Sequence, residues 1–343
     1  MRWPAKLAFA ALTTALVTAC SESSRQLPVA ELSGSAMGTA YSVKIVSPPD
    51  GLDVAALQQE VDQQLAGIEQ QMSTYIADSE LSSFNAHRGM DWFEVSGELC
   101  RLVADALSIS AASGGAFDIT VGPLVNLWGF GPDGSAAEPP DAHLIAVLLD
   151  SVGSAALHAD CSMPALRKNC PDVYVDLSAI AKGYGVDRLA ALLDGRELRN
   201  YLVEIGGELR VRGKNAKADA WAVAIEAPLR SGRSVHAIVK VTDAAVATSG
   251  DYRNYFEHDG SVYSHTIDPR TGYPVAHTAA SVTVVADEAA FADAMATALL
   301  VLGPEDGLAL AERDGIAAYY LVRQDGAIDA RLSSKFAAEV RLQ

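Results

Sequence analysis

The segment of residues 288–302 constrains the fold most, because its pattern predicts a helix that is apolar on nearly every face. Its sequence, EAAFADAMATALLVL, puts Phe291 and Met295 in one stripe at helical spacing, and other apolar residues lie around the rest of the wheel. Such a helix is normally buried. Gly303-Pro304 is expected to end it. Other elements of the chain must therefore cover this helix on several sides.

The rest of the chain alternates predicted strand hairpins with helices. Helices are expected at residues 53–72, 96–112 and in the segment that follows Ser178. Strands are expected at 39–47, 172–176, 200–213 (a hairpin turned by Gly206-Gly207), 221–228, 234–250, 281–287 and 317–333. Hairpins with interspersed helices predict an α+β fold with largely antiparallel or mixed sheets and packed helices. No GxGxxG or P-loop follows a predicted strand, so a Rossmann or Walker site is unsupported.

The N-terminus reads as an export signal. Arg2 and Lys6 precede the apolar run LAFAALTTALV, which is too short to span a bilayer. The run leads to VTAC, which resembles a bacterial lipoprotein cleavage box with Val17 in place of the usual leucine. We therefore expect a lipoprotein signal peptide over 1–19, lipidation of Cys20, a tether over 20–31 and the domain over 32–343. The alternative is an ordinary signal peptide with a chance cysteine.

Export predicts a lipoprotein of the bacterial cell envelope that faces the periplasm, with the inner membrane as the expected anchor site. An oxidising compartment allows disulfides. Cys161 and Cys170 flank the loop SMPALRKN, and a disulfide between them is expected, with two buried thiols as the alternative. Cys100, on an apolar helix face, is expected to be a buried free thiol. No CxxC motif signals a zinc or redox site.

The charge balance bears on partners. The chain has 26 basic and 43 acidic residues and a formal net charge of −17. Nucleic-acid binding needs basic patches, so no nucleic-acid partner is expected. An anionic substrate would have to be met locally, by a metal ion, helix N-termini or a few basic side chains.

The buried helix carries one pair of polar side chains in its middle. Asp293 and Thr297 are four residues apart, so they point the same way. A buried carboxylate needs a partner, and carboxylate plus hydroxyl oxygens suit a hard cation such as Mg²⁺. The bland alternative is that Asp293 pairs with an arginine or caps a loop.

A second candidate is the stiff loop SHTIDPRTGYP, residues 264–274. His265 is its natural proton acceptor, since an unperturbed imidazole has a pKa near neutrality. Asp268 and Arg270 are expected to lock the loop through a mutual salt bridge. In the alternative, His265 merely caps that locked loop.

Three other segments carry weaker signals. In VDLSAIAKGYG, Asp176 and the turn through Ser178 would present backbone N–H groups to an anion near Lys182, or form an ordinary turn with a solvent lysine. Asp118 lies between glycine-rich turns that let a ligand approach closely. Met37 and Tyr75 could offer flat apolar surface to a ring, and the alternative is that each is an ordinary core residue.

Taken together, these motifs resemble the ApbE family of exported FAD:protein FMN transferases. The matching motifs occur in the family's order, from about Leu32 to the C-terminal region: SAMGTAYSV, MSTYIADSELSSFN, GAFDITVGPLVNLWGFG, VDLSAIAKGYGVDRL, VEIGGELRVRG, SHTIDPRTGYPV and ADAMATALLVLG. The resemblance implies a single catalytic unit with a T-fold-related architecture. It also implies Mg²⁺-dependent transfer of FMN from FAD to a threonine or serine hydroxyl, with release of AMP.

The resemblance also implies roles for individual residues and partners. His265 matches the family's catalytic base, and the metal ligands fall on the carbonyl of Ala179 and the side chains of Asp293 and Thr297. FAD contacts fall on Met37, Tyr75, Ala116, Phe117, Asp118, Asp176, Lys182 and Ile267. Targets of the family are subunits of membrane redox complexes of the Nqr and Rnf types. Two rival functions stay open: a Mg²⁺-dependent FAD pyrophosphatase, and a non-catalytic FAD-binding lipoprotein.

Overall fold

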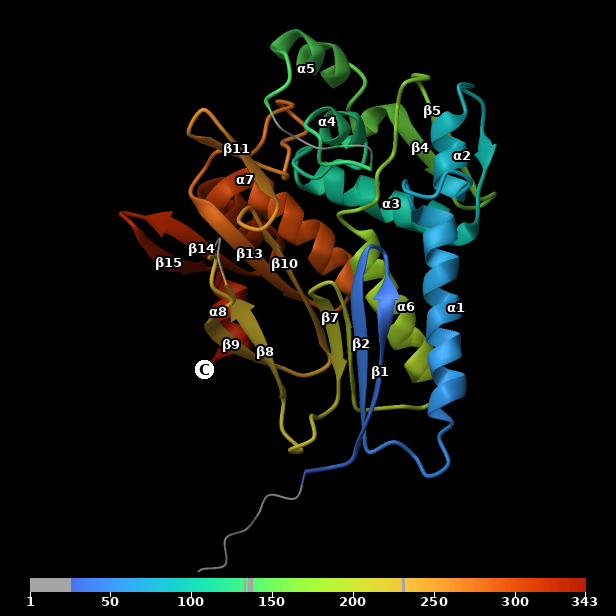
Figure 1. Cartoon of the computed structure of the whole chain (residues 1–343), viewed down its shortest axis with the longest axis vertical. Helices are drawn as coiled ribbons and strands as arrows, with labels where there is room; N and C mark the ends of the chain where they lie inside the picture. The colour runs from blue at the N-terminus through green and yellow to red at the C-terminus, as the bar shows by residue number, and fades with distance from the viewer. Residues whose placement is uncertain (1–25, 133, 135–137, 230–231) are drawn as a thin grey trace, which may run out of the picture.

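An eight-stranded antiparallel sheet is the largest element of the computed structural model, which describes residues 26–132, 134, 138–229 and 232–343 (Figure 1). Its strand order is β1-β2-β6-β7-β10-β13-β14-β15. The strands are β1 Val29–Ala36, β2 Thr39–Val46, β6 Tyr201–Ile205, β7 Glu208–Arg212, β10 Ala244–Gly250, β13 Ala279–Ala286, β14 Ala317–Gln324 and β15 Ala327–Leu332. The predicted hairpins at 200–213 and 317–333 are two of its strand pairs.

The predicted apolar helix is the first part of α7, Ala289–Asp314, which packs on β10 and β13 (Figure 1). Gly303 breaks the helical geometry with φ 80° and ψ 179°, so the helix ends there as predicted, and a second helical stretch continues from Pro304. Among the described residues, α7 is the one helix with the length and apolar composition to cross a membrane. However, 67% of its apolar window is buried inside the fold.

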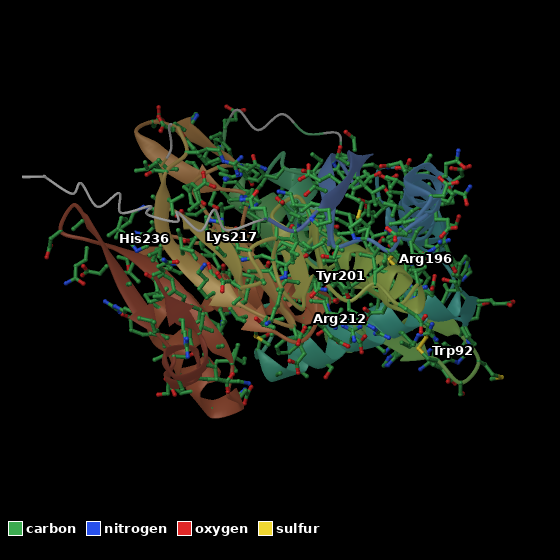
Figure 2. The ribbon with its side chains drawn as sticks, turned by 90° about the horizontal axis from the view of Figure 1, so that it is seen from below. Trp92, Arg196, Tyr201, Arg212, Lys217 and His236 are labelled. Atoms are coloured by element: carbon green, nitrogen blue, oxygen red, sulfur yellow. A yellow bond between two sulfur atoms is a disulfide. The ribbon has the colours of Figure 1, made fainter. Side chains whose placement is uncertain are left out.

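Other helices surround the sheet and α7. They are α1 Val54–Met72, α2 Glu80–Ala86, α3 Gly97–Ala112, α4 Gly122–Leu127, α5 Ala142–Leu149, α6 Ala181–Gly195 and α8 Ser334–Glu339. Asp194 near the end of α6 anchors the β6–β7 hairpin, because its Oδ1 accepts hydrogen bonds from the Tyr201 hydroxyl at 3.0 Å and from Arg212. Figure 2 shows Tyr201 and Arg212 lying close together on this side. This anchoring holds α6 against the sheet.

Smaller sheets flank the large one. One has the order β16-β9-β8, with β8 Trp221–Glu226, β9 Val235–Val241 and β16 Arg341–Leu342. Another has the order β3-β5-β4, with β3 Phe93–Glu94, β4 Leu157–Asp160 and β5 Ala165–Lys168. The strands β11 Tyr255–His258 and β12 Ser261–Ser264 form a hairpin that leads into the loop of residues 264–274. A single-turn 3-10 helix at Ser154–Ala156 precedes β4.

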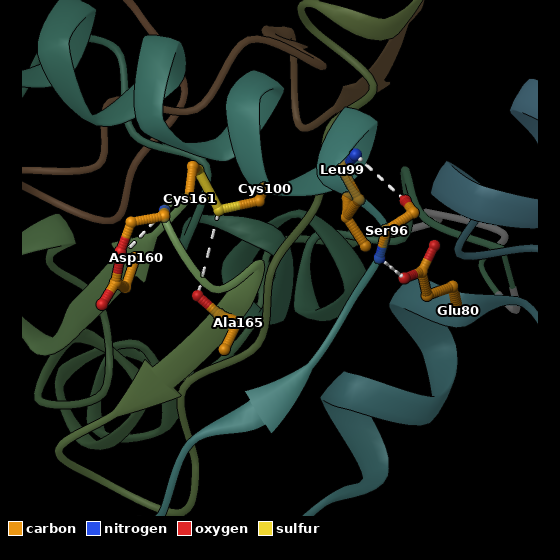
Figure 3. Close-up of a disulfide and its surroundings, with 8 residues drawn as sticks. Glu80, Ser96, Leu99, Cys100, Asp160, Cys161 and Ala165 are labelled. Atoms are coloured by element: carbon orange, nitrogen blue, oxygen red, sulfur yellow. Dashed lines mark hydrogen bonds between the residues drawn. A yellow bond between two sulfur atoms is a disulfide. The ribbon is translucent and has the colours of Figure 1, made fainter.

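The expected disulfide between Cys161 and Cys170 is wrong. Cys161 is bonded to Cys100, with 5.7 Å between their Cα atoms, and Cys170 is free (Figure 3). In the β4–β5 hairpin, Asp160 pairs with Ala165 and Leu157 with Lys168, so Cys161 and Cys170 lie at opposite ends. At about 3.3 Å per strand residue that distance far exceeds disulfide reach. Cys100, expected as a free thiol, instead faces the turn that carries Cys161.

Two further boundaries differ from expectation. Residues 172–176 form no strand, although Asp176 N–H donates to the Ile119 carbonyl at 2.7 Å and ties this extended segment to the chain near Asp118. β1 begins at Val29 and pairs with β2, so the last residues of the expected tether belong to the sheet. The signal peptide and Cys20 lie outside the described residues.

Candidate active site

A cavity of about 860 Å³ lies where α6, α7, the large sheet and the loop of residues 264–274 meet. It is lined by most of the residues that the sequence singled out: Tyr75, Ala116, Phe117, Asp118, Asp176, Ala179, Lys182, His265, Ile267, Asp293 and Thr297. Pockets of this size bind cofactor-sized ligands. The structure thus places together residues that are far apart in the sequence.

Asp293 is nearly fully buried in this cavity, with 3% of its surface exposed. Its Oδ2 accepts a hydrogen bond from the Gly183 N–H at 3.1 Å and lies 3.7 Å from Lys182 Nζ. Burial raises the pKa of Asp293, and Lys182 and the Gly183 N–H partly offset this. Asp293 therefore pairs with a lysine from α6, and with no arginine, in the described residues.

Glu208 is a second buried carboxylate, which the sequence reasoning missed. It begins β7, is 5% exposed, and its Oε1 lies 3.6 Å from Lys182 Nζ. Its Oε2 is buried without a hydrogen-bond partner. Burial and the nearby Asp293 charge raise the pKa of Glu208 to about 8. The sequence feature that could have identified Glu208 is the Gly206-Gly207 turn directly before it, because this turn places Glu208 at the end of the sheet beside the cavity.

Lys182 keeps its charge between these two carboxylates. Burial alone would lower its pKa, but Asp293 and Glu208 outweigh that effect and raise it. The lysine is thus neither a solvent residue nor a titrating base. It is a fixed positive charge in the cavity. An acidic protein needs such a local positive charge if it is to bind an anionic ligand.

Asp293 and Thr297 bring to the cavity oxygen atoms of the kind that bind a hard cation. Thr297, one turn further along α7, faces the cavity, and its Oγ1 lies 3.0 Å from Ser249 Oγ on β10. Ala179 lines the same cavity. Carboxylate, hydroxyl and carbonyl oxygens form the donor set that Mg²⁺ prefers. Glu208 Oε1 lies 3.6 Å from Lys182 Nζ, so Lys182 has a second carboxyl group beside it besides Asp293.

His265 lines the cavity, and one of its ring nitrogens is held by the backbone. Its Nδ1 lies 3.0 Å from the Asn254 carbonyl, which also accepts the His265 backbone N–H. A carbonyl can only accept, so Nδ1 carries the proton and Nε2 of the neutral ring has the free lone pair. Burial lowers the pKa of His265, and the positive charge of Lys182 acts in the same direction, while the Asn254 carbonyl opposes both. The ring is therefore neutral at physiological pH.

The loop that carries His265 is locked as the sequence predicted. Arg270 donates from Nε and Nη2 to the two carboxylate oxygens of Asp268, at 2.9 and 2.8 Å. Gly272, at φ 78°, closes the turn, and its carbonyl accepts from Trp128 Nε1 at 2.8 Å. The Phe130 ring packs edge-on against His265 with 6.2 Å between ring centroids. These contacts fix the position of the imidazole.

Comparisons with known proteins show the family of this chain. The family model of the ApbE family matches residues 37–320. A FAD:protein FMN transferase of Vibrio cholerae is 44% identical over 94% of this chain and 95% of its own length, and one of Haemophilus influenzae is 39% identical over 96% and 97%.

This chain belongs to the ApbE family.

Solved structures of ApbE proteins have the same fold. The flavin transferase ApbE from Vibrio cholerae superposes with a TM-score of 0.84 at 41% identity, covering 91% of this chain and 99% of its own. The apo form of the flavinyl transferase ApbE from Pseudomonas stutzeri gives 0.83 at 41% identity, covering 91% and 97%. The prediction of an ApbE-family transferase with an α+β fold is confirmed.

Not every predicted FAD contact of this ApbE chain lines the cavity. Met37 packs beside α6 at the β1–β2 turn, and its N–H donates to Glu69 Oε1 at 2.6 Å. The Asp118 carboxylate accepts from the Thr120 N–H, the Thr120 hydroxyl and the Ser154 N–H at 2.6–2.8 Å. Asp118 thus organises its own turn. Tyr75 is 67% exposed at the rim, so its ring is open to a planar ligand.

Proposed function

We propose that this chain transfers the FMN half of FAD to a threonine or serine hydroxyl of a target protein, with release of AMP, in a Mg²⁺-dependent reaction. The observation that carries the proposal is the arrangement of His265 in one cavity with the buried Asp293 and with Thr297. The names of the curated relatives, FAD:protein FMN transferase, support the same reaction.

His265 suits the role of general base. Its Nδ1 proton is held by the Asn254 carbonyl, so Nε2 can accept the proton of the acceptor hydroxyl. The hydroxyl oxygen then attacks the phosphorus of the FMN half. A phosphoester bond forms, the pyrophosphate P–O bond to AMP breaks, and AMP leaves with the electron pair.

The transferring phosphoryl group needs its negative charge neutralised. Asp293, Thr297 and the Ala179 carbonyl would hold a Mg²⁺ ion, which supplies this neutralisation when bound. Lys182, kept charged by Asp293 and Glu208, contributes a positive charge on the same side of the cavity. The exposed Tyr75 and the apolar Phe117 and Ile267 line the remainder and would contact FAD.

The targets proposed for this reaction are subunits of Nqr- or Rnf-type membrane redox complexes. An enzyme anchored through Cys20 to the inner membrane and facing the periplasm would meet such subunits where they are exposed. The sequence pattern of residues 1–20 supports this location.

The test is incubation of the purified enzyme with FAD, Mg²⁺ and the soluble domain of an Nqr- or Rnf-type subunit. We expect mass spectrometry to find the subunit heavier by one FMN, with one AMP released per FMN attached. Free FMN without modified protein would show a pyrophosphatase instead. Bound FAD without any AMP release would show a binding protein.

A further inference from the structure

The free edge of strand β8 faces the catalytic cavity. Within the described residues β8 pairs only with β9, because the sheet order is β16-β9-β8. In the view of Figure 1, β8 is drawn on the side of β9 that faces β7. The consecutive residues 222–226 all line the cavity. Since alternate side chains of a strand point to opposite faces, it is the edge of β8 that borders the cavity.

Most of this edge lacks the lysines, prolines and bulges that usually protect edge strands from pairing. Its sequence, WAVAIE, has no lysine or proline and a single charge at its end. The edge strands of the large sheet differ, because β1 carries Glu31 and β15 carries Asp329 and Arg331. The pairing of β8 with β9 shifts register between Ile225 and Glu226, so the uncharged and regular part of the edge is residues 221–225, and such an edge is a template for another extended chain. Here that template opens into the site of the reaction.

The end of β8 is linked through Arg253 and Asn254 to His265, the proposed general base. Glu226 accepts hydrogen bonds from Arg253, and from Arg233 at 3.3 Å. Arg253 adjoins Asn254, whose carbonyl holds His265 Nδ1. A chain paired along β8 would therefore reach the neighbourhood of His265 as it passes Glu226. The exposed alanines at 222 and 224 leave room for the side chains of such a chain.

We propose that the target protein binds by adding an extended segment to the free edge of β8, which delivers its acceptor hydroxyl to His265. The inference rests on the proposed transfer reaction, because an acceptor residue that belongs to another protein must enter the cavity as part of a polypeptide chain. Main-chain hydrogen bonds to β8 give affinity that is nearly independent of side chains. The acceptor residue itself is then selected by what fits beside His265.

The test uses Ala224→Lys, which puts a charged side chain on the free edge, in the full-length enzyme. Ala330→Lys is the matched control, because it places the same change at an exposed position of the edge strand β15. Binding of the Nqr- or Rnf-type subunit domain is measured by titration, separately from FMN transfer. We expect Ala224→Lys to weaken subunit binding, titrated in the absence of FAD because Ala224 lines the cavity, about tenfold or more, while Ala330→Lys matches the wild type.

A second measurement tests the backbone pairing itself. Peptides of the acceptor segment are made with one N-methylated amide each, at successive positions. Strand pairing uses every second amide toward one edge, so methylation should weaken binding at alternate positions only. Uniform sensitivity, or none, would overturn the proposal.

The outcomes separate the two proposals. If the wild-type enzyme binds the subunit but transfers no FMN, the transfer reaction fails while the β8 edge is still tested by the binding titration. Wild-type subunit affinity of Ala224→Lys in the absence of FAD, or a wild-type enzyme that binds no subunit, would each overturn the β8 proposal.

Discussion

His265 and Lys182 have fixed protonation states in the site. Lys182 is charged because two carboxylates surround it, and His265 is neutral because its burial and the lysine disfavour a second positive charge. In the proposed reaction, the charged Lys182 would neutralise negative charge and the neutral His265 would accept a proton.

Replacing His265 with alanine should remove proton acceptance and little else. We expect FAD binding to persist and FMN transfer to fall about 10²–10⁴-fold, the usual effect of losing a general base. Transfer is measured by the mass of the target subunit and FAD binding by fluorescence titration. Normal transfer by this variant would exclude His265 as the base.

The transfer rate should depend on pH through His265. Only the neutral imidazole accepts a proton, and burial lowers its pKa below the ordinary value of 6.5. The acid limb of the rate profile should therefore lie below pH 6.5, and the rate should stay on its plateau as pH rises from there toward 7. A limb above pH 6.5 would contradict the environment described for His265.

At the scale of elements, α6 and α7 approach each other closely at Gly183. A Cβ atom there would lie 2.2 Å from the Ala289 carbonyl oxygen, and the Gly183 N–H holds Asp293. The contact between two helices thus sets the position of the buried carboxylate.

Gly183→Ala should damage both stability and activity. Overpacking of this kind costs about 1–3 kcal/mol of unfolding free energy, and a shift of Asp293 by about 1 Å could lower transfer 10²-fold. Gly195→Ala in the same helix is the control, because a Cβ there meets nothing within 4 Å. Denaturant unfolding and transfer assays compare the two. Equal unfolding free energies of the two variants would show that α6 and α7 can move apart at Gly183 without loss of stability.

Asp293→Ala should abolish Mg²⁺ dependence and transfer together, since the variant loses the one carboxylate of the predicted ligand set. Asp293→Asn keeps the shape and serves as the matched variant for packing. Transfer is measured across a Mg²⁺ titration, with thermal unfolding as the check on folding. Wild-type turnover of Asp293→Ala would exclude the predicted metal site on α7.

Local patterns predicted most elements, but not how they pack. The helix expected at 53–72 is found at Val54–Met72, and the one at 96–112 at Gly97–Ala112. The sequence did not predict Glu208 as a site residue. The alternation in ELRVR puts Glu208 on the strand face opposite Leu209, and such a face is expected to contact solvent. In the structure α6 covers that face. Burial on both sheet faces depends on long-range packing, which a local period does not contain.

At the scale of the whole molecule, the disulfide joins distant parts of the chain. Cys100 and Cys161 are separated by 61 residues and link α3 to the β4–β5 hairpin. The sequence offered three cysteines beyond Cys20, and only the packing of α3 on that hairpin decides which two meet.

Removing this disulfide should destabilise the protein, and removing Cys170 should not. We expect Cys100→Ala/Cys161→Ala to lose about 2–4 kcal/mol of unfolding free energy, measured by denaturant unfolding. Cys170→Ala should match the wild type. Peptide mapping without reduction checks the pairing directly, and a peptide that links Cys161 to Cys170 would contradict it.

Strand β2 has one partner that arrives early in synthesis and one that arrives late. It pairs with β1 through Ala36 and Thr39, but with β6 through Tyr41 and Ile205. At about 5–20 residues per second, the ribosome reaches β6 roughly 10–30 s after β2. During that interval the edge of β2 that will pair with β6 has no partner. The yield of native protein therefore depends on what covers this edge until residue 205 has been synthesised.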